Sequence, residues 1–186
     1  MLIMEIACKQ CNGHYKIREG KFGVFAGCSN YPRCKSTMKV FELVQTFILE
    51  RGIDVYKWEK VCWKCNEITP VYSYYLGYEL EEIDEYLSSF GPVGLGDITY
   101  IDQLLGEEIP SVQMRFSNTT KSEYMANTCA FCGALQGRNY VVYDPHEIIE
   151  ELWHNRNMEK YHYKTFHIDC IAPLMFDVQR IYTESN

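Results

Sequence analysis

The chain has 186 residues, of which 47% are hydrophobic and 15% aromatic, and its formal net charge is −7. This composition provides enough apolar residues for the cores of one or two small folded domains. It excludes an intrinsically disordered chain. No run of about 18 apolar residues predicts a membrane span, and residues 1–5 lack the basic start of a signal peptide, so we expect a cytoplasmic protein.

The charge is unevenly distributed along the sequence. Residues 1–40 contain seven Lys or Arg against two Glu and carry +5, whereas residues 41–186 carry −12. The segment from Cys65 to Met114 contains no Lys or Arg. A polyanion should therefore approach the N-terminal part first, and the acidic remainder either keeps the protein soluble or engages another protein.

The first cysteine set lies at Cys8, Cys11, Cys28 and Cys34. Two cysteines two residues apart can reach one tetrahedral Zn²⁺ from a single turn, and a second pair across a hairpin completes four thiolate ligands. Between the pairs, residues 15–18 and 22–26 alternate like short strands around a turn at residues 19–21. The pattern predicts a zinc ribbon, with His14 as a surface side chain outside the ligand set.

The sequence of residues 21–34, KFGVFAGCSNYPRC, closely resembles the C-terminal zinc finger of type IA DNA topoisomerases. The resemblance extends over about residues 5–40. In that family such ribbons are accessory modules that hold single-stranded DNA by aromatic stacking and basic side chains. They do not cut or rejoin strands. The resemblance thus implies DNA contact, while the catalytic domains of a topoisomerase would need several hundred more residues.

Aromatic and basic residues alternate within this ribbon, as in proteins that bind single strands by stacking on bases and following phosphates. Because a ribbon of this size has almost no core, some of the rings must instead cover the metal site. The candidate nucleic-acid-binding residues are Tyr15, Lys16, Arg18, Lys21, Phe22, Phe25, Tyr31, Arg33 and Lys35.

After the ribbon, apolar residues at helical spacing predict a helix over residues 41–51, ended by Gly52. We expect its apolar stripe, formed by Phe41, Val44, Phe47 and Ile48, to pack against the second domain. The domain organisation predicted here is a ribbon over residues 1–40, a helical connector over 41–60 and an α+β domain over 61–186.

The second cysteine set comprises Cys62, Cys65, Cys129 and Cys132, two C-x2-C pairs separated by 63 residues. Lengthening a loop from ~15 to ~63 residues costs roughly 1–1.5 kcal/mol, against about 10–16 kcal/mol for binding structural zinc. We therefore predict a split four-cysteine site with the insertion 66–128, and two structural zinc ions per chain. The alternative is that one of the two cysteine pairs binds zinc together with His167 and Cys170.

Residues 119–137 around the closing pair resemble a zinc-binding region of uncharacterised bacterial proteins, which implies zinc and a bacterial origin. The remaining pattern predicts an α+β domain. Its expected strands are 68–75, 139–143 and 161–168, and its expected helices are 78–90, 97–105 and 144–157, the last with Asp144 as N-cap.

A cluster of His162, His167, Asp169 and Cys170 has the residue types of a thiol nucleophile with its base, but neighbours in a strand point to opposite faces. We expect a buried structural role for Cys170, with zinc ligation or catalysis as alternatives. The functional hypothesis is a non-catalytic protein whose ribbon binds single-stranded DNA and whose acidic domain engages a protein partner. The competing hypothesis is a protein-interaction adaptor with purely structural zinc.

Overall fold

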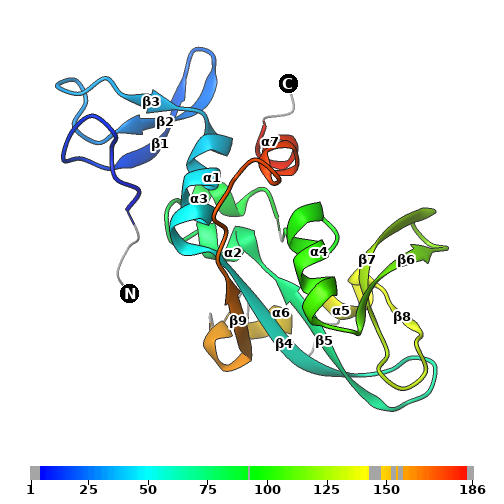
Figure 1. Cartoon of the computed structure of the whole chain (residues 1–186). Helices are drawn as coiled ribbons and strands as arrows, with labels where there is room; N and C mark the ends of the chain where they lie inside the picture. Colours follow the sequence, from blue (N-terminus) through cyan, green and yellow to red (C-terminus); the bar gives the residue numbers. More distant parts are fainter. Residues whose placement is uncertain (1–4, 92, 143–147, 152–153, 155–156, 184–186) are drawn as a thin grey trace. The chain divides into compact units, whose positions relative to one another are not determined.

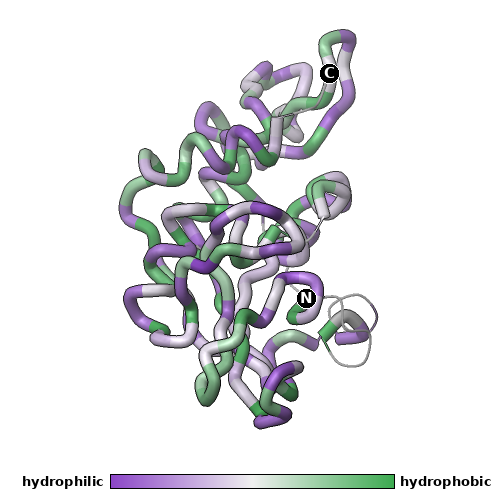
Figure 2. Tube along the Cα trace, turned by 90° about the vertical axis from the view of Figure 1, so that its right-hand side faces the viewer, coloured by the Kyte–Doolittle hydropathy of each residue, from purple (hydrophilic) through white to green (hydrophobic). Residues whose placement is uncertain are grey.

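The computed structural model describes residues 5–91, 93–142, 148–151, 154 and 157–183. It is an α+β fold, as predicted, and the chain divides into two compact units. Unit 1 combines residues 1–53, 75–93 and 167–186, and unit 2 combines residues 54–74 and 94–166. Hydrophobic and hydrophilic residues alternate in short runs along the trace, as expected where each helix or strand buries one face (Figure 2).

The N-terminal ribbon is a three-stranded antiparallel sheet in unit 1, in the order β1-β2-β3 (Figure 1). Its strands are β1 (Tyr15–Gly20), β2 (Gly23–Cys28) and β3 (Thr37–Met38), so both predicted strands are confirmed. Arg18 lies opposite Phe25 in the register, and Lys16 lies opposite Gly27. Since side chains alternate between faces, Lys16, Arg18 and Phe25 share one face of the hairpin.

Helix α1 (Val40–Arg51) follows the ribbon, and its first turn is fixed by the Glu42 carboxylate, which accepts the Lys39 backbone N–H at 2.7 Å. Gly52 ends the helix at φ 87°, a conformation that favours glycine. The predicted apolar stripe is buried in unit 1 except for Phe41, which is half-buried; Val44, Phe47 and Ile48 are inaccessible to solvent. It packs beside α7 (Met175–Tyr182).

The other helices of unit 1 correct the predicted single helix over residues 78–90. Two short helices are present, α2 (Leu76–Leu80) and α3 (Glu85–Ser88). The break lies at Asp84, whose carboxylate accepts the Tyr86 backbone N–H at 2.9 Å and starts a new helix. Helix α7 was not predicted, although Val178 and Tyr182, four residues apart, are both buried along one side of it.

Unit 2 contains two three-stranded sheets, ordered β5-β4-β9 and β6-β7-β8, in which β4 pairs antiparallel with β5, and β7 with both β6 and β8. Their strands are β4 (Ile53–Val61), β5 (Ile68–Tyr74), β9 (His162–Phe166), β6 (Val112–Ser117), β7 (Ser122–Thr128) and β8 (Leu135–Gln136). The helices are α4 (Thr99–Glu108), α5 (Arg138–Val142) and α6 (Ile148–Glu150), with a 3₁₀ turn, η2, at Met158–Tyr161.

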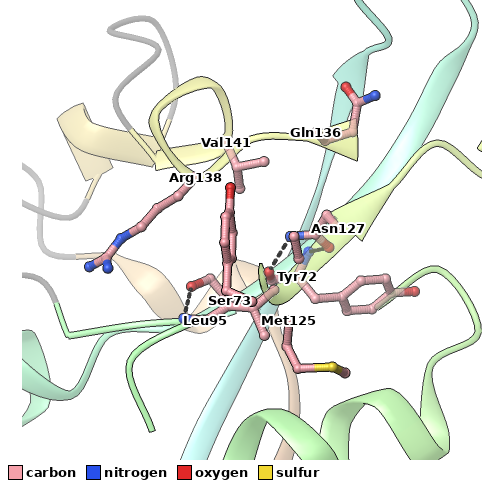
Figure 3. A pocket seen from close by; sticks show the side chains of 10 residues that line it. Tyr72, Ser73, Leu95, Met125, Asn127, Gln136, Arg138 and Val141 are labelled. Atoms are coloured by element: carbon pink, nitrogen blue, oxygen red, sulfur yellow. Dashed lines mark hydrogen bonds between the residues drawn. The ribbon is translucent and has the colours of Figure 1, made fainter. Parts of the chain in front are cut away.

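One buried side chain joins the two sheets of unit 2. The Asn127 amide on β7 donates to the Tyr72 carbonyl at 2.8 Å, and its carbonyl oxygen accepts the Tyr72 backbone N–H at 2.8 Å (Figure 3). Asn127 therefore satisfies the backbone of β5 as a neighbouring strand would. Beside it, the Leu95 backbone N–H donates to Ser73 Oγ at 3.2 Å.

Several element predictions for this unit are wrong. Residues 53–60 of the predicted helical connector are strand β4, because Ile53, Val55 and Trp58 are buried within an extended, sheet-paired segment. Residues 138–142 are helix α5, so the predicted strand 139–143 is wrong over its described part. Helix α4 passes through Gly106 to Glu108 instead of ending at Leu105.

The predicted cap at Asp144 and parts of the helix 144–157 lie outside the described residues. The predicted strands 68–75 and 161–168 are confirmed, with slightly shorter bounds. Among the described residues, no helix combines the length and apolarity needed to cross a membrane.

Candidate zinc centres and nucleic-acid interface

The first group of cysteines converges at the base of the ribbon. The Sγ atoms of Cys8, Cys11, Cys28 and Cys34 all lie within 4.8 Å of one another. Cys8 and Cys34 Sγ are 3.8 Å apart, and Cys11 and Cys28 Sγ are 3.4 Å apart. Four sulfurs about 2.3 Å from a tetrahedral Zn²⁺ would be about 3.8 Å from one another, whereas a disulfide needs about 2.05 Å. The arrangement fits a zinc ion and contains no disulfide.

Backbone geometry sets the positions of these sulfurs. The Cys8 N–H donates to the Gly13 carbonyl at 2.8 Å and closes the first turn. Within the turns, the Gln10 N–H points at Cys8 Sγ and the Asn30 N–H at Cys28 Sγ, both at 3.4 Å. Such N–H groups stabilise thiolates, so each turn supports the first sulfur that it carries.

The second group forms from two hairpin turns in unit 2. The Sγ atoms of Cys62, Cys65, Cys129 and Cys132 also lie within 4.8 Å of one another. Cys62 and Cys132 Sγ are 3.7 Å apart, and Cys65 and Cys129 Sγ are 3.6 Å apart. The predicted pairing across the 63-residue insertion is therefore confirmed, and the chain has two four-cysteine centres suited to structural zinc.

The two turns of the second centre are built alike. One joins β4 to β5 and the other joins β7 to β8. In each, the N–H two residues after the first cysteine points at its Sγ, from Lys64 to Cys62 and from Phe131 to Cys129, both at 3.4 Å. Each turn also places a residue in the left-handed region, Asn66 at φ 60° and Gly133 at φ 67°.

Side-chain donors to the sulfurs were not predicted. The amide of Gln136 is buried and donates to Cys62 Sγ at 3.3 Å and to the Ala134 carbonyl at 2.9 Å. In the ribbon, the exposed Asn30 amide donates to Cys11 Sγ at 3.4 Å. Donors of this kind neutralise part of the charge of four thiolates around one dication. Gln136 could have been suspected only from its position four residues after Cys132.

The thiols of each centre are electrostatically unequal. The Gln10 backbone N–H, with other donors, lowers the pKa of Cys8 to about 6, whereas burial raises the pKa of Cys28 to about 12. Four thiolates at these separations repel one another, so the metal-free centre retains protons at neutral pH. A zinc ion would displace those protons and be held by all four sulfurs, leaving no open position for a catalytic water.

Other candidate ligands do not join these centres. Of the described residues, His167 and Cys170 belong to neither four-cysteine group. Cys170 is exposed, so the expectation of a buried role is wrong. His162 instead lies 3.4 Å from the Asp54 carboxylate, and His14 Nδ1 lies 3.3 Å from the Glu5 carboxylate.

The structure places the predicted nucleic-acid-binding residues in four parts of the ribbon: its core, one face of the hairpin, the β1–β2 turn and the loop around Cys34. Tyr15 is 3% exposed and its hydroxyl lies 2.7 Å from Ser36 Oγ, so its assignment as a stacking residue is corrected to core. Lys16, Arg18 and Phe25 share one face of the hairpin, where both cations are exposed and Phe25 is half-buried. The remaining five are exposed: Lys21 and Phe22 in the β1–β2 turn, and Tyr31, Arg33 and Lys35 in the loop around Cys34.

On this face the Phe25 ring is half-buried and packs against glycines. A Cβ atom at Gly20 would lie 3.0 Å from Phe25 Cε1, and one at Gly27 would lie 3.1 Å from Cε2 and 2.9 Å from Arg18 Cδ. The ring therefore lies over bare backbone, with the Arg18 side chain beside it. The Arg18 guanidinium donates to the Cys28 carbonyl at 3.3 Å, which holds the cation close to the ring.

The fold and the two centres define a small α+β zinc protein with a ribbon at its N-terminus. A family model described as the topoisomerase DNA binding C4 zinc finger matches residues 5–41. This confirms the resemblance for the ribbon, and the match ends in the first turn of α1. Comparison with curated proteins and with solved structures gives no match.

Proposed function

We propose that this chain is a non-catalytic zinc protein that binds single-stranded DNA through its N-terminal ribbon. The observation that carries the proposal is the hairpin face on which Lys16, Arg18 and Phe25 lie together over glycine backbone. A base can stack on the ring while the two cations approach the adjacent phosphates. The match to a DNA-binding zinc-finger family over residues 5–41 supports the same function.

Charge supports this location for a polyanion. Residues 1–40 carry +5 in a chain of net charge −7, and Lys21, Arg33 and Lys35 add exposed cations to the ribbon. Phe22 at the turn is 96% exposed, with Lys21 Nζ 5.5 Å from its ring centre. An aromatic ring left in water beside a cation has little structural purpose and is suited to stacking. Both zinc ions would be structural.

The test is fluorescence anisotropy of a labelled single-stranded oligonucleotide with the full zinc-loaded chain at two salt concentrations. Phe25→Ala should weaken binding by ~1–3 kcal/mol, the usual contribution of one stacked base. The double variant Lys16→Ala/Arg18→Ala should also reduce the dependence of affinity on salt, because fewer counterions are released.

Two controls match these changes outside the ribbon. Phe176→Ala removes another exposed ring, and Lys57→Ala/Lys160→Ala removes two other positive charges. Equal losses in the ribbon variants and their controls, or no binding by the parent chain, would contradict the proposal.

A protein-interaction adaptor is the second candidate. It is favoured by α7, where Met175 and Phe176 are 51% and 77% exposed within the acidic C-terminal part of the sequence. Adjacent exposed apolar side chains on one helix turn suit a protein partner. Loss of a co-purifying protein on Phe176→Ala, with unchanged DNA affinity, would support this candidate.

A further inference from the structure

A groove in unit 2 is lined by aromatic rings and by uncharged polar side chains. Its volume is about 770 Å³, and all of its described lining residues belong to this unit. The rings are those of Trp63 in the β4–β5 turn, Phe116 on β6, Tyr124 on β7 and Tyr140 on α5. The polar side chains are hydroxyls and carboxamides, from Ser117, Asn118, Thr119, Thr120, Ser122 and Asn139. We refer to these residues as the aromatic groove.

Trp63 and Phe116 are the exposed rings of the groove, at 60% and 52% exposure. The Trp63 indole N–H donates to the Leu135 carbonyl at 2.7 Å, so this ring is held in place while it remains accessible. A ligand that packs on it therefore causes little further loss of side-chain entropy. The Tyr140 ring is a wall of the groove, because Lys60 Nζ already lies 4.9 Å from its centre.

The lining of the groove is electrically neutral. Arg138 is the one charged side chain among its described residues, and the Arg138 guanidinium lies 2.6 Å from the Asp97 carboxylate. No acidic residue belongs to the described lining. A charged ligand would lose hydration in the groove without gaining a counter-ion from these residues, which is unfavourable. The lining therefore favours a neutral ligand.

The polar side chains of the groove can both donate and accept hydrogen bonds. Ser117 Oγ accepts the Thr120 backbone N–H at 3.2 Å, so some of this capacity stabilises the β6–β7 turn. Within the described part of the chain, the exposed side chains of Asn118, Thr119 and Asn139 have no hydrogen-bond partner. Carboxamides and hydroxyls complement the hydroxyl groups of a ligand, since those groups also donate and accept.

We propose that the aromatic groove binds a neutral carbohydrate, at a site that is independent of the N-terminal ribbon and of its proposed function. The C–H face of one sugar ring packs on Trp63 or Phe116, and sugar hydroxyls exchange hydrogen bonds with the carboxamide and hydroxyl side chains. The volume lies within the range of small-molecule sites, about 300–1,000 Å³. A nucleic acid fits less well, because the one cation of the described lining is paired with Asp97.

The test titrates the full zinc-loaded, nitrogen-15-labelled chain with three neutral trisaccharides, chitotriose, cellotriose and maltotriose, and follows the protein by NMR. At least one sugar should bind saturably and shift the Trp63 indole N–H resonance. Its affinity should be equal at low and high salt, because the complex contains no ion pair between protein and ligand.

Two variants and a matched control locate the site. Trp63→Ala and Phe116→Ala should each lower the sugar affinity about tenfold, in the range of one lost ring contact. Phe131→Ala should bind like the parent chain, because Phe131 is 66% exposed in the turn between β7 and β8 and is not part of the described lining. Zinc content of two ions per chain checks each variant, and Phe116→Ala provides the result if Trp63→Ala loses zinc.

Three outcomes would overturn the carbohydrate site. They are the absence of binding by all three sugars, equal affinities of the Phe116→Ala and Phe131→Ala variants with zinc retained, and displacement of the sugar by a single-stranded oligonucleotide. An oligonucleotide bound at the ribbon should instead leave the sugar in place. The ribbon proposal is tested separately by its own variants, so either proposal can fail without the other.

Discussion

The two zinc centres use the same four ligands but different chain arrangements. The first closes within 27 residues, from Cys8 to Cys34, around one hairpin. The second joins two hairpins whose cysteine pairs are separated by 63 residues. A local centre can organise only its own ribbon, whereas a split centre fixes the relative position of β4–β5 and β7–β8 within unit 2. Loss of zinc from the first centre should therefore unfold the ribbon alone, whereas loss of zinc from the second should destabilise unit 2.

The largest effect is expected from removing a ligand. Cys129→Ser and Cys34→Ser should each leave one zinc ion per chain in place of two. Structural zinc contributes on the order of 10–16 kcal/mol, so the affected centre should unfold locally. Cys129→Ser should lower the thermal stability of unit 2 broadly, because it releases two hairpins, while Cys34→Ser should disorder only the ribbon.

Metal analysis and circular dichroism measure these outcomes. Cys170→Ser is the control, since Cys170 is exposed and outside both centres, and it should keep two zinc ions. Two zinc ions in Cys129→Ser would show that the second centre does not need all four cysteines.

The Asn127 side chain provides the next largest test. Asn127→Ala removes both hydrogen bonds to Tyr72 and leaves buried backbone groups unpaired, so the free energy of unfolding should fall by ~2–4 kcal/mol. Chemical denaturation measures this change. Asn118→Ala, at an exposed loop position, should change stability by no more than ~0.5 kcal/mol. Equal stability of the two variants would mean that the sheets of unit 2 are held together mainly by apolar contacts and zinc.

The donors to the sulfurs offer a finer comparison. Gln136→Leu should weaken zinc binding at the second centre by about 10–100-fold, because a buried thiolate loses its amide donor. Asn30→Leu should weaken the first centre less, since water can replace an exposed donor to Cys11. Competition with a chromophoric chelator would measure both. A greater loss for Asn30→Leu would reverse the comparison.

The smallest difference between the centres is expected in their response to pH. In each, one thiol has a pKa near 6 (Cys8, Cys62) and one near 12 (Cys28, Cys65). Zinc displaces protons from the thiols whose pKa exceeds the working pH, so its affinity should fall as pH decreases from 8 to 6, by about tenfold or more per unit. The two centres should follow parallel curves in chelator titrations, and a flat curve at either would contradict the protonated metal-free state.

A feature of this protein could be predicted from the sequence when it depends mainly on residues that are close together in the chain. The four ligands of the first centre, the β1–β2 hairpin and α1 follow from spacing and alternation among neighbouring residues, and the structure has them where the sequence predicted. The pairing of Cys62 and Cys65 with Cys129 and Cys132 could also be inferred, because zinc binding outweighs the cost of closing a long loop.

Other features depend on partners distant in the sequence, and only the tertiary structure decided them. Tyr15 and Phe25 are both aromatic residues of one hairpin, but the Tyr15 ring is buried with its hydroxyl against Ser36, whereas the Phe25 ring is half-buried over glycines. Residues 53–60 were expected in a helical connector, but pairing with β5 makes them strand β4. Residues 139–143 were expected to form a strand, but residues 138–142 form helix α5, which buries Val141. In both segments, tertiary contacts outweigh intrinsic propensity. The Asn127 connection arises where β5 and β7, which are distant in the sequence, come together, and no local pattern records that contact. The sequence thus determined the metal ligands and the charged ribbon, whereas tertiary packing determined which rings remain open to a ligand.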